Sequence, residues 1–306
     1  MTARLREERG QAVVMTLIFL VVLIGAAALT TDVGAWYRQQ RQAQATADAA
    51  ALAGAQALPG DPTQAQVLAA QYATDNGGGV PAGGITLRSD FEPNDTVVVQ
   101  VQKNAPSFFA NIFSIDHATV AATAAARAGV PNQVFGIAPI AVDKDHPYLT
   151  GPGCPCFDVP TSLCLGNSCN GGLPSGAFGM VDLNGGSNGV PELADWIENG
   201  YDGYLPLGQY QSSPGAKFNA GPVKSALSDR IGTELLFPVY NGTGGNGANA
   251  YYNVIGWVAF HLTGFSGGGS SAELDGWFTK VIWNGLQGTT DSGLPDFGVY
   301  SVELVN

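Results

Sequence analysis

Four cysteines lie close together in the stretch GCPCFDVPTSLCLGNSC, at positions 154, 156, 164 and 169. Their thiols could form disulfides or bind a zinc ion. Zinc sites of four thiolates commonly use C-x-x-C pairs, whereas this spacing is C-x-C followed by C-x₄-C. An even number of cysteines in a Gly/Pro-rich loop is typical of disulfides outside the cytoplasm. We therefore expect two disulfides among Cys154, Cys156, Cys164 and Cys169, and our guess at the pairing is 154 with 169 and 156 with 164.

A second cluster of polar residues lies in VDLNGGSNGVPELAD, where Asp182, Asn184 and Asn188 could bind calcium through oxygen atoms. An EF-hand loop would need an oxygen ligand where Gly186 lies and a glutamate where Leu193 lies. Asp, Asn and Gly are also common turn formers, which explains the stretch without a metal. We expect turn formation here, with a calcium loop as the weaker alternative and no other metal site.

Two copies of the pattern Gly-x-Ser-x-Gly centre on Ser187 and Ser266, and His261 lies between them in the sequence. A nucleophile elbow needs a strand, a sharp turn and a helix around a triad. The chain has 42 glycines, so chance matches to this pattern are common. The sequence also lacks an oxyanion-hole motif and a parallel βαβ pattern. We therefore expect no enzymatic activity and no cofactor, and we retain an anchored hydrolase only as the weakest alternative.

The whole chain carries a formal net charge of −12, and only 12% of its residues are charged. Nucleic-acid partners are disfavoured, because phosphate contacts need a surface rich in Lys and Arg. At the same time 45% of the residues are hydrophobic, so the chain can form a core. This composition predicts a loop-rich β protein that works outside the cytoplasm.

An apolar run near the N-terminus indicates on which side of a membrane the rest of the chain lies. Residues 12–29 contain Thr16 as their single polar interruption, and no charge occurs between Arg9 and Asp32. Such a length can cross a bilayer as a helix. Arg4, Arg6 and Arg9 precede the run, whereas the chain beyond it is acidic. By the positive-inside rule, residues 1–10 are cytoplasmic and the bulk of the protein is extracytoplasmic.

The membrane helix is expected to continue as a rod, so that one helix covers residues 11–58. Residues 36–58 contain no proline and consist mainly of strong helix formers. Trp36 and Tyr37 lie where an aromatic belt would meet the membrane surface. Ala43, Ala47 and Ala51 recur every four residues, and small residues at that spacing allow another backbone to approach closely. This face is expected to pack against another subunit or against the protein's own domain.

The order of these features resembles the N-terminal segment of the tight-adherence (Flp-type) pilus-assembly family, the TadE/TadG-like proteins. The matching features are Arg9-Gly10, the apolar run, Asp32 with Gly34 at its end, an Arg/Gln stretch and ADAAALAGA from Ala47. The resemblance implies a bacterial, single-pass membrane protein that acts in assembly or anchoring of a pilus. The residues assigned to the membrane and packing helix are Gly10, Gly25, Asp32, Trp36, Tyr37, Ala43, Ala47 and Ala51.

Three fates of the N-terminus remain open. The helix is retained as an anchor, or it is cut after Gly10 as in prepilins, or it is cut after Ala28 in the small-residue stretch that starts at Gly25. Prepilin-type cleavage in related pseudopilins goes with a glutamate at the fifth residue after the cut, where this chain has Met15. We favour the retained anchor.

The rest of the chain divides into two parts where the composition changes. Residues 59–130 read as a small α+β unit with a helix, a strand from Thr96, helical turns over 106–113 and a second strand from His117. The apolar side chains of those helical turns are expected to form its core. They are Phe108, Phe109, Ile112 and Phe113.

Residues 131–306 read as a Gly-rich, mostly antiparallel β domain with two helices, which begin near residues 191 and 221. The expected strands cover 134–142, 177–183, 235–240, 251–263, 277–283 and 297–304. The predicted fold class is therefore α+β, with a long N-terminal transmembrane helix.

The function we expect is a structural, membrane-anchored component of tight-adherence pilus assembly. Its partners would be the membrane, a pilin or other pilus-assembly proteins, and further copies of itself through the Ala-rich helix. The alternative is a membrane-anchored surface binding module, such as an adhesin or a binder of cell-wall sugars, that uses the aromatic C-terminal domain.

Overall fold

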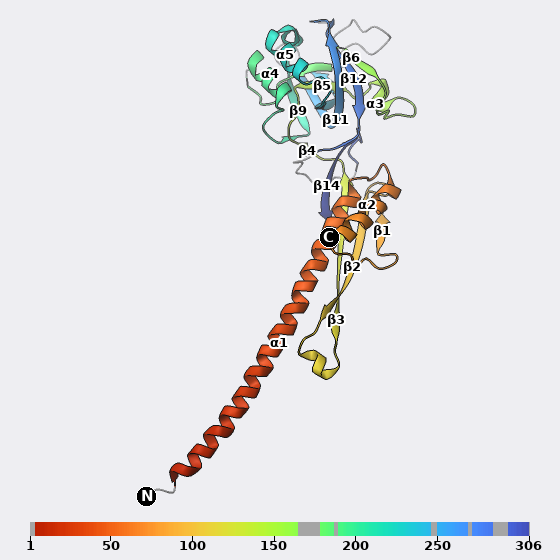
Figure 1. Cartoon of the computed structure of the whole chain (residues 1–306). Helices are drawn as coiled ribbons and strands as arrows, with labels where there is room; N and C mark the ends of the chain where they lie inside the picture. The colour runs from red at the N-terminus through yellow and green to blue at the C-terminus, as the bar shows by residue number, and fades with distance from the viewer. Residues whose placement is uncertain are drawn as a thin grey trace. The chain divides into compact units, whose positions relative to one another are not determined.

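The computed structural model of the protein describes residues 4–164, 178–186, 189–245, 250–268, 271–283 and 293–305 (Figure 1). The chain forms two compact units. Unit 1 consists of Met1–Ala128 together with Val302–Asn306, and unit 2 consists of Gly129–Ser301. The predicted α+β class with mostly antiparallel sheets is confirmed.

Helix α1 (Arg4–Ala55) is one unbroken helix of 52 residues. Its most apolar 18-residue window has a mean hydropathy of 2.9, and none of that window is buried. In the part of the chain that the structure describes, α1 is the one helix long and apolar enough to cross a membrane. The hydroxyl of Thr16 in the apolar run donates to the carbonyl of Ala12 at 2.9 Å, so its hydrogen bond is made inside the helix.

In unit 1, a second helix and a sheet pack against the C-terminal part of α1. Helix α2 (Pro62–Asp75) begins at Asp61, whose side chain accepts a hydrogen bond from the N–H of Gln64 at 2.8 Å. The first four strands of a five-stranded sheet lie in the order β1 (Ile85–Arg88), β2 (Thr96–Pro106), β3 (His117–Gly129) and β14 (Val299–Val305), and β13 (Val281–Ile282) pairs with the start of β14. The C-terminal residues 302–306 therefore return to unit 1, which the expected boundary at residue 131 did not include.

The core of unit 1 is built from small and β-branched side chains. Alanines spaced three or four residues apart on α1 are fully buried against alanines of α2 and alternate valines of β2. Small residues allow backbones to approach closely. The residues of this packed face are Ala43, Ala47, Ala50, Ala51 and Ala55 of α1, Ala65, Ala69 and Ala73 of α2, and Val97, Val99 and Val101 of β2.

Unit 2 contains a seven-stranded sheet in the order β10-β5-β7-β9-β11-β12-β6, and β10 also pairs with β11. The strands β10, β5, β7, β9 and β11 thus close into a ring. Neighbouring strands are antiparallel except β5 and β10, which are parallel. The strand bounds are β5 Ile140–Asp143, β6 Thr161–Cys164, β7 Phe178–Val181, β9 Gly208–Ser213, β10 Glu234–Gly244, β11 Tyr251–Ser266 and β12 Glu273–Thr279.

Two helices, α4 (Val190–Glu198) and α5 (Gly221–Asp229), contact each other in unit 2, as Figure 1 shows. Both have a proline in the first turn, where its missing N–H costs nothing. The largest fully buried aromatic side chains of this unit are Trp257, Phe218, Phe237, Phe260 and Phe278. Short elements complete the fold: η1 (Ala110–Phe113), β4 (Gln133–Val134), α3 (Pro147–Thr150), β8 (Leu205–Pro206), η2 (Gly215–Asn219) and β13 (Val281–Ile282).

The apolar residues expected to form the core of unit 1 are exposed, so that prediction is wrong. Phe108 and Phe109 are 60% and 42% exposed, and Ile112 and Phe113 are both 79% exposed. The reason is the length of the β2–β3 hairpin. Its two strands pair over eleven positions, whereas β1 pairs only with residues 96–99 of β2. The far half of the hairpin extends past the sheet, and the four side chains lie at its tip.

Gly54 lies where α1 packs closely against α2 and β2. A Cβ atom there would lie 2.9 Å from the carbonyl oxygen of Ala65 and 3.0 Å from the Cβ of Ala69. We predict that Gly54→Ala destabilises unit 1 by about 1–3 kcal/mol, because backbone atoms must shift. The check is hydrogen–deuterium exchange of α2 in the full chain in detergent, where exchange should become faster.

The matched control is Gly34→Ala on the same helix, because a Cβ there meets nothing within 4 Å. It should leave the exchange of α2 unchanged. Equal exchange in both variants would contradict the role assigned to Gly54.

His146 is a fully buried titratable group in unit 2, and burial lowers its pKa to about 4. Its Nδ1 accepts a hydrogen bond from the N–H of Tyr148 at 3.2 Å, and its ring meets the ring of Phe278 edge-on at 5.1 Å. As the pH falls below about 6.5, the unfolded chain binds a proton that the folded chain does not. The stability of unit 2 should therefore decrease between about pH 6.5 and pH 4, by up to about 3 kcal/mol.

This prediction is checked by measuring the unfolding of unit 2 against pH in wild type and in His146→Asn. Asparagine does not titrate and can still accept the N–H of the following turn. The variant should lack this part of the pH dependence, and an unchanged pH dependence would show that other groups cause it.

Candidate membrane-proximal site

Asp32 holds the tip of the β2–β3 hairpin against α1. One carboxylate oxygen accepts the N–H of Phe108 at 2.7 Å, the other accepts the N–H of Ala110 at 2.6 Å, and the N–H of Phe109 lies within 3.2 Å of both. These N–H groups begin the short helix η1, where intrahelical acceptors are missing. A negative charge is favourable at such an end. Asp32 is only 3% exposed, so the end of the apolar run is joined to a segment about 76 residues later in the chain.

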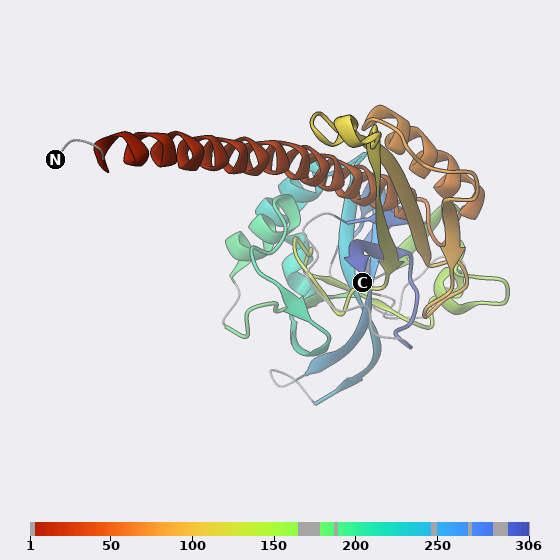
Figure 2. The same ribbon diagram turned by 90° about the horizontal axis from the view of Figure 1, so that it is seen from below.

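Two further contacts connect the hairpin to α1. The side-chain amide of Gln40 donates to the carbonyl of Ala121 at 2.7 Å, and the ammonium of Lys103 donates to the hydroxyl of Thr46 at 3.1 Å. Figures 1 and 2 both show the yellow hairpin tip beside α1. The contacts at Asp32, Gln40 and Thr46 follow one side of the helix, so the hairpin runs along α1 toward the apolar run.

The other residues assigned to the membrane and packing helix have different surroundings. Ala43, Ala47 and Ala51 are fully buried within unit 1. Tyr37 is 60% exposed, and its hydroxyl accepts a hydrogen bond from Arg41 at 3.3 Å. Trp36 is half-buried, and Gly25 and Gly10 lie within α1, where a Cβ on Gly25 would meet nothing within 4 Å.

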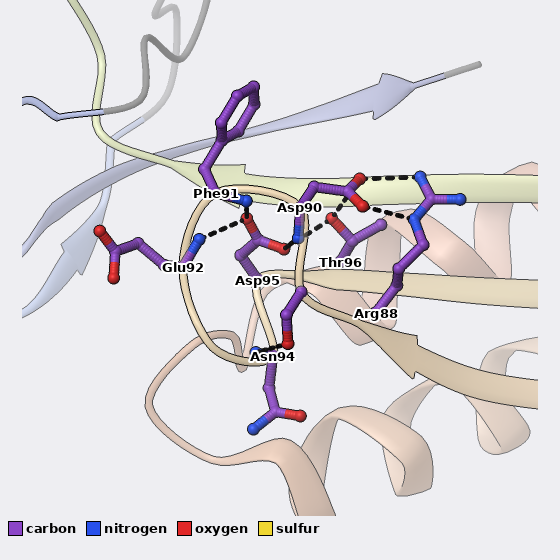
Figure 3. A network of polar contacts seen from close by, with 8 residues as sticks. Arg88, Asp90, Phe91, Glu92, Asn94, Asp95 and Thr96 are labelled. Carbon is purple, nitrogen blue, oxygen red and sulfur yellow. Dashed lines mark hydrogen bonds and ion pairs between the residues drawn. The ribbon is translucent and has the colours of Figure 1, made fainter.

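The loop between β1 and β2 is closed by a network around Asp95 (Figure 3). Its carboxylate accepts the N–H groups of Asp90, Phe91 and Glu92 at 2.8–3.0 Å and the hydroxyl of Thr96 at 2.9 Å. Burial on its own would raise the pKa of Asp95, but these hydrogen bonds outweigh it and leave the pKa below its ordinary value. The carboxylate is thus used by its own loop, which makes this network structural.

Arg127 connects that loop to the C-terminal strand. Its guanidinium lies 4.4 Å from the ring centre of Phe91 and pairs with the carboxylate of Glu303 at 3.0 Å. Neither Asp95 nor Arg127 is predicted from the sequence as a functional or structural site. The turn-forming composition of SDFEPNDT is a signal for Asp95, whereas the partner of Arg127 depends on the return of β14, which no local pattern indicates.

The cysteines do not pair as we guessed. Cys154 is bonded to Cys156, so the pairing of 154 with 169 and 156 with 164 is wrong. The chain turns between the two cysteines and brings their Cα atoms to 4.5 Å, which is within the range for a disulfide. Cys164 is buried at the end of β6, and Cys169 lies outside the described residues. That all four cysteines form disulfides stays a prediction.

The oxygen-rich loop near residue 182 is organised by its own hydrogen bonds. Asp182 is buried and accepts the N–H groups of Asn184 at 3.2 Å and Gly185 at 3.1 Å. The amide of Asn184 donates to Glu192 at 2.7 Å, and Asn188 lies outside the described residues. In the described part of the chain, no group of three or more His, Cys, Asp or Glu side chains is arranged to bind a metal.

Of the two Gly-x-Ser-x-Gly patterns, only the one around Ser266 has its serine among the described residues. Ser266 pairs with Glu273 in the antiparallel hairpin of β11 and β12, which is not a strand–turn–helix elbow. Ser187 lies outside the described residues. His261 stacks on Trp277 with ring centres 4.4 Å apart, and its Nδ1 lies 3.1 Å from a carboxylate oxygen of Glu234.

Unit 2 contains a cavity of ≈ 550 Å³ whose charged groups are Arg230 and Glu234. Arg230 donates to the carbonyls of Ile197 and Glu198 at the end of α4 and to the carbonyl of Glu234. It therefore closes the C-terminus of α4, as basic side chains often do. The cavity is lined by Phe135, Gly136, Asn199, Arg230, Glu234, Val281, Ile282 and Trp283.

We predict that Asp32→Ala frees the hairpin tip from α1. Without the carboxylate, the amides of residues 108–110 lose their acceptor, and their hydrogen exchange should become about tenfold faster or more. Asp48→Ala is the matched control, because Asp48 accepts only from Gln44 of the same helix among the hydrogen bonds described. If the tip exchanges equally in wild type and Asp32→Ala, the carboxylate does not hold it.

A family model matches the N-terminal part of the chain. No curated protein and no solved structure matches the chain significantly. The family model described as Flp pilus-assembly TadE/G-like matches residues 10–57. That segment contains the apolar run, Asp32 and the packed alanines of α1. The resemblance of the N-terminal segment to the TadE/TadG-like pilus-assembly family is therefore confirmed for residues 10–57.

Proposed function

We propose that this protein is a membrane-anchored structural component of tight-adherence pilus assembly. Helix α1 holds it in the cell membrane with residues 1–10 in the cytoplasm and both units outside. The family match over residues 10–57 supports the pilus-assembly context. Arg4, Arg6 and Arg9 before the apolar run support the orientation.

The observation that carries this proposal is the continuity of α1. The helix runs without a break from the apolar run into the core of unit 1, where Ala43, Ala47 and Ala51 are fully buried. A flexible linker between anchor and domain would let the domain move freely. Here the membrane segment and unit 1 share one helix, so a force on unit 1 reaches the membrane through a continuous hydrogen-bonded backbone. That property suits a part that positions or holds an assembly.

Retention of the N-terminal helix fits this role. Cleavage after Ala28 would remove the apolar run and leave Asp32 near a new chain end, although Asp32 holds the hairpin tip. Cleavage after Gly10 would keep the apolar run but remove the three arginines that orient it. We therefore propose that the mature protein keeps its N-terminus and spans the membrane once.

Partners would contact α1 on the side that unit 1 leaves open. The Ala43, Ala47 and Ala51 face is covered by α2 and β2, so a second copy cannot use it in the folded protein. On another side of the helix, Arg41 and Ala45 are exposed. We propose that this side of α1 mediates self-association or contacts another pilus-assembly protein. We propose that unit 2, which contains the disulfide, contacts further pilus-assembly proteins.

One observation favours the second candidate, a membrane-anchored binding module. The cavity of ≈ 550 Å³ in unit 2 is partly lined by Phe135 and Trp283, and aromatic side chains are common where sugars and other ligands bind. The indole N–H of Trp283 already donates to the carbonyl of Phe135 at 2.9 Å, and the Arg230 donors are occupied as well. This leaves few polar groups for ligand recognition, so we rank the pilus-assembly role first.

The test is complementation of a deletion strain of the bacterium that encodes the chain. The full chain should restore pili on the cell surface, counted by electron microscopy. A chain whose residues 1–31 are replaced by a cleavable signal peptide should not, because its units are released from the membrane. Normal piliation of the deletion strain would contradict the proposal. Normal piliation together with loss of surface-glycan binding would favour the binding module.

A further inference from the structure

We propose that the hairpin tip, residues 107–115, inserts into the outer surface of the same bilayer that α1 crosses. The tip would then be a second membrane contact of unit 1. This inference rests on the proposed membrane span of α1, and its partner is the lipid bilayer, reached through apolar side chains.

The first observation is the apolar surface of the tip. Phe108, Phe109 and Ile115 are 60%, 42% and 48% exposed, and Ile112 and Phe113 are both 79% exposed. No charged residue occurs between Lys103 and Asp116. Five large apolar side chains gathered on one short loop form the kind of patch that marks a protein or membrane contact.

The second observation is the depth of the tip relative to the hydrocarbon core of the bilayer. Residues 12–29 form about 27 Å of helix, which matches the roughly 30 Å of a hydrocarbon core. Asp32 lies three residues beyond Leu29, about 4.5 Å farther along the helix. Its carboxylate binds the N–H groups of Phe108 and Ala110. The start of the tip is therefore fixed at the boundary between hydrocarbon and lipid headgroups.

The third observation is the direction of the hairpin. Thr46 of α1 contacts Lys103, Gln40 contacts Ala121, and Asp32 contacts Phe108 and the two residues after it. Lys103 and Ala121 lie at neighbouring positions in the middle of the hairpin, whereas its tip contacts Asp32, which is nearest the apolar run. The hairpin thus points at the membrane, and Ile112 and Phe113 follow the segment that Asp32 holds.

The surroundings match the chemistry of a membrane interface. Tyr37 is exposed five residues after Asp32, and Arg38 and Arg41 are exposed just beyond it. Aromatic side chains are enriched at this depth, and basic side chains can extend from it to headgroups. Of all partners that could cover the tip, the bilayer is the one whose position is set by the same helix. We therefore propose the bilayer as the partner of the tip, and the test below would also detect a second copy of the chain or another protein in its place.

The test is photo-crosslinking of the full chain in vesicles of phosphatidylethanolamine and phosphatidylglycerol. A photoreactive amino acid replaces Ile112 or Phe113, and the products are identified by intact mass. Leu20 in the apolar run is the positive control, and Val67 of α2, which is 53% exposed, is the negative control. We expect one-phospholipid adducts at Ile112, Phe113 and Leu20, and far fewer at Val67.

Lipid adducts at Leu20 without adducts at Ile112 and Phe113 would overturn the proposal and leave the membrane span intact. Crosslinks from the tip to another copy of the chain, in place of lipid, would overturn it as well. Absence of lipid adducts at Leu20 would instead contradict the membrane span, and with it the proposed function.

The role of Asp32 is tested with the probe at Ile112 in two backgrounds. In Asp32→Ala the lipid adducts at Ile112 should fall severalfold, because the tip is no longer held beside α1, while the adducts at Leu20 stay constant. In Asp48→Ala both should stay constant. Unchanged adducts at Ile112 in Asp32→Ala would show that the carboxylate does not set the depth of the tip.

Discussion

The close contact of small side chains on the C-terminal part of α1 is the interaction on which the rest of unit 1 depends. Three layers meet there: alanines of α1, alanines of α2 and alternate valines of β2, all fully buried. No long side chain separates the backbones, so the helix, the second helix and the sheet take fixed positions relative to one another. Because β2 is fixed, the hairpin that extends from it is fixed as well, and Asp32 meets its tip.

Much of the fold could be predicted from the sequence, because its strongest signals are local. The apolar run, the absence of proline and the recurrence of alanine every four residues predict α1. The alternation of apolar and polar residues predicts β2 and β11. The predictions that are wrong concern features that local sequence patterns do not determine. Phe108 to Phe113 read as core because apolar side chains are usually buried, and only the unequal lengths of β1 and the hairpin leave them outside. The bond between Cys154 and Cys156 depends on a turn that the cysteine count does not specify.

The candidate site was predictable only in part, for a related reason. Asp32 stood out as the charge at the end of the apolar run, but its acceptor role depends on a segment far away in the sequence. Asp95 and Asp182 act in the same manner within their own loops, and each accepts backbone N–H groups. In a chain of net charge −12, several carboxylates are thus used to organise loops rather than to bind ligands. Acidic residues here are poor indicators of a metal or catalytic site.

The return of β14 has a consequence for how the protein can be made. Unit 2 leaves unit 1 after β3 and rejoins it before residue 302, so it is an insertion between two strands of one sheet. During synthesis α1 is made first, whereas β14, which lies beside β3 on the side away from β2, is made last. Until then β3 has an unpaired edge on that side. Unit 1 therefore completes its sheet only after all of unit 2 has been synthesised, and any chain that ends early within unit 2 leaves both units defective.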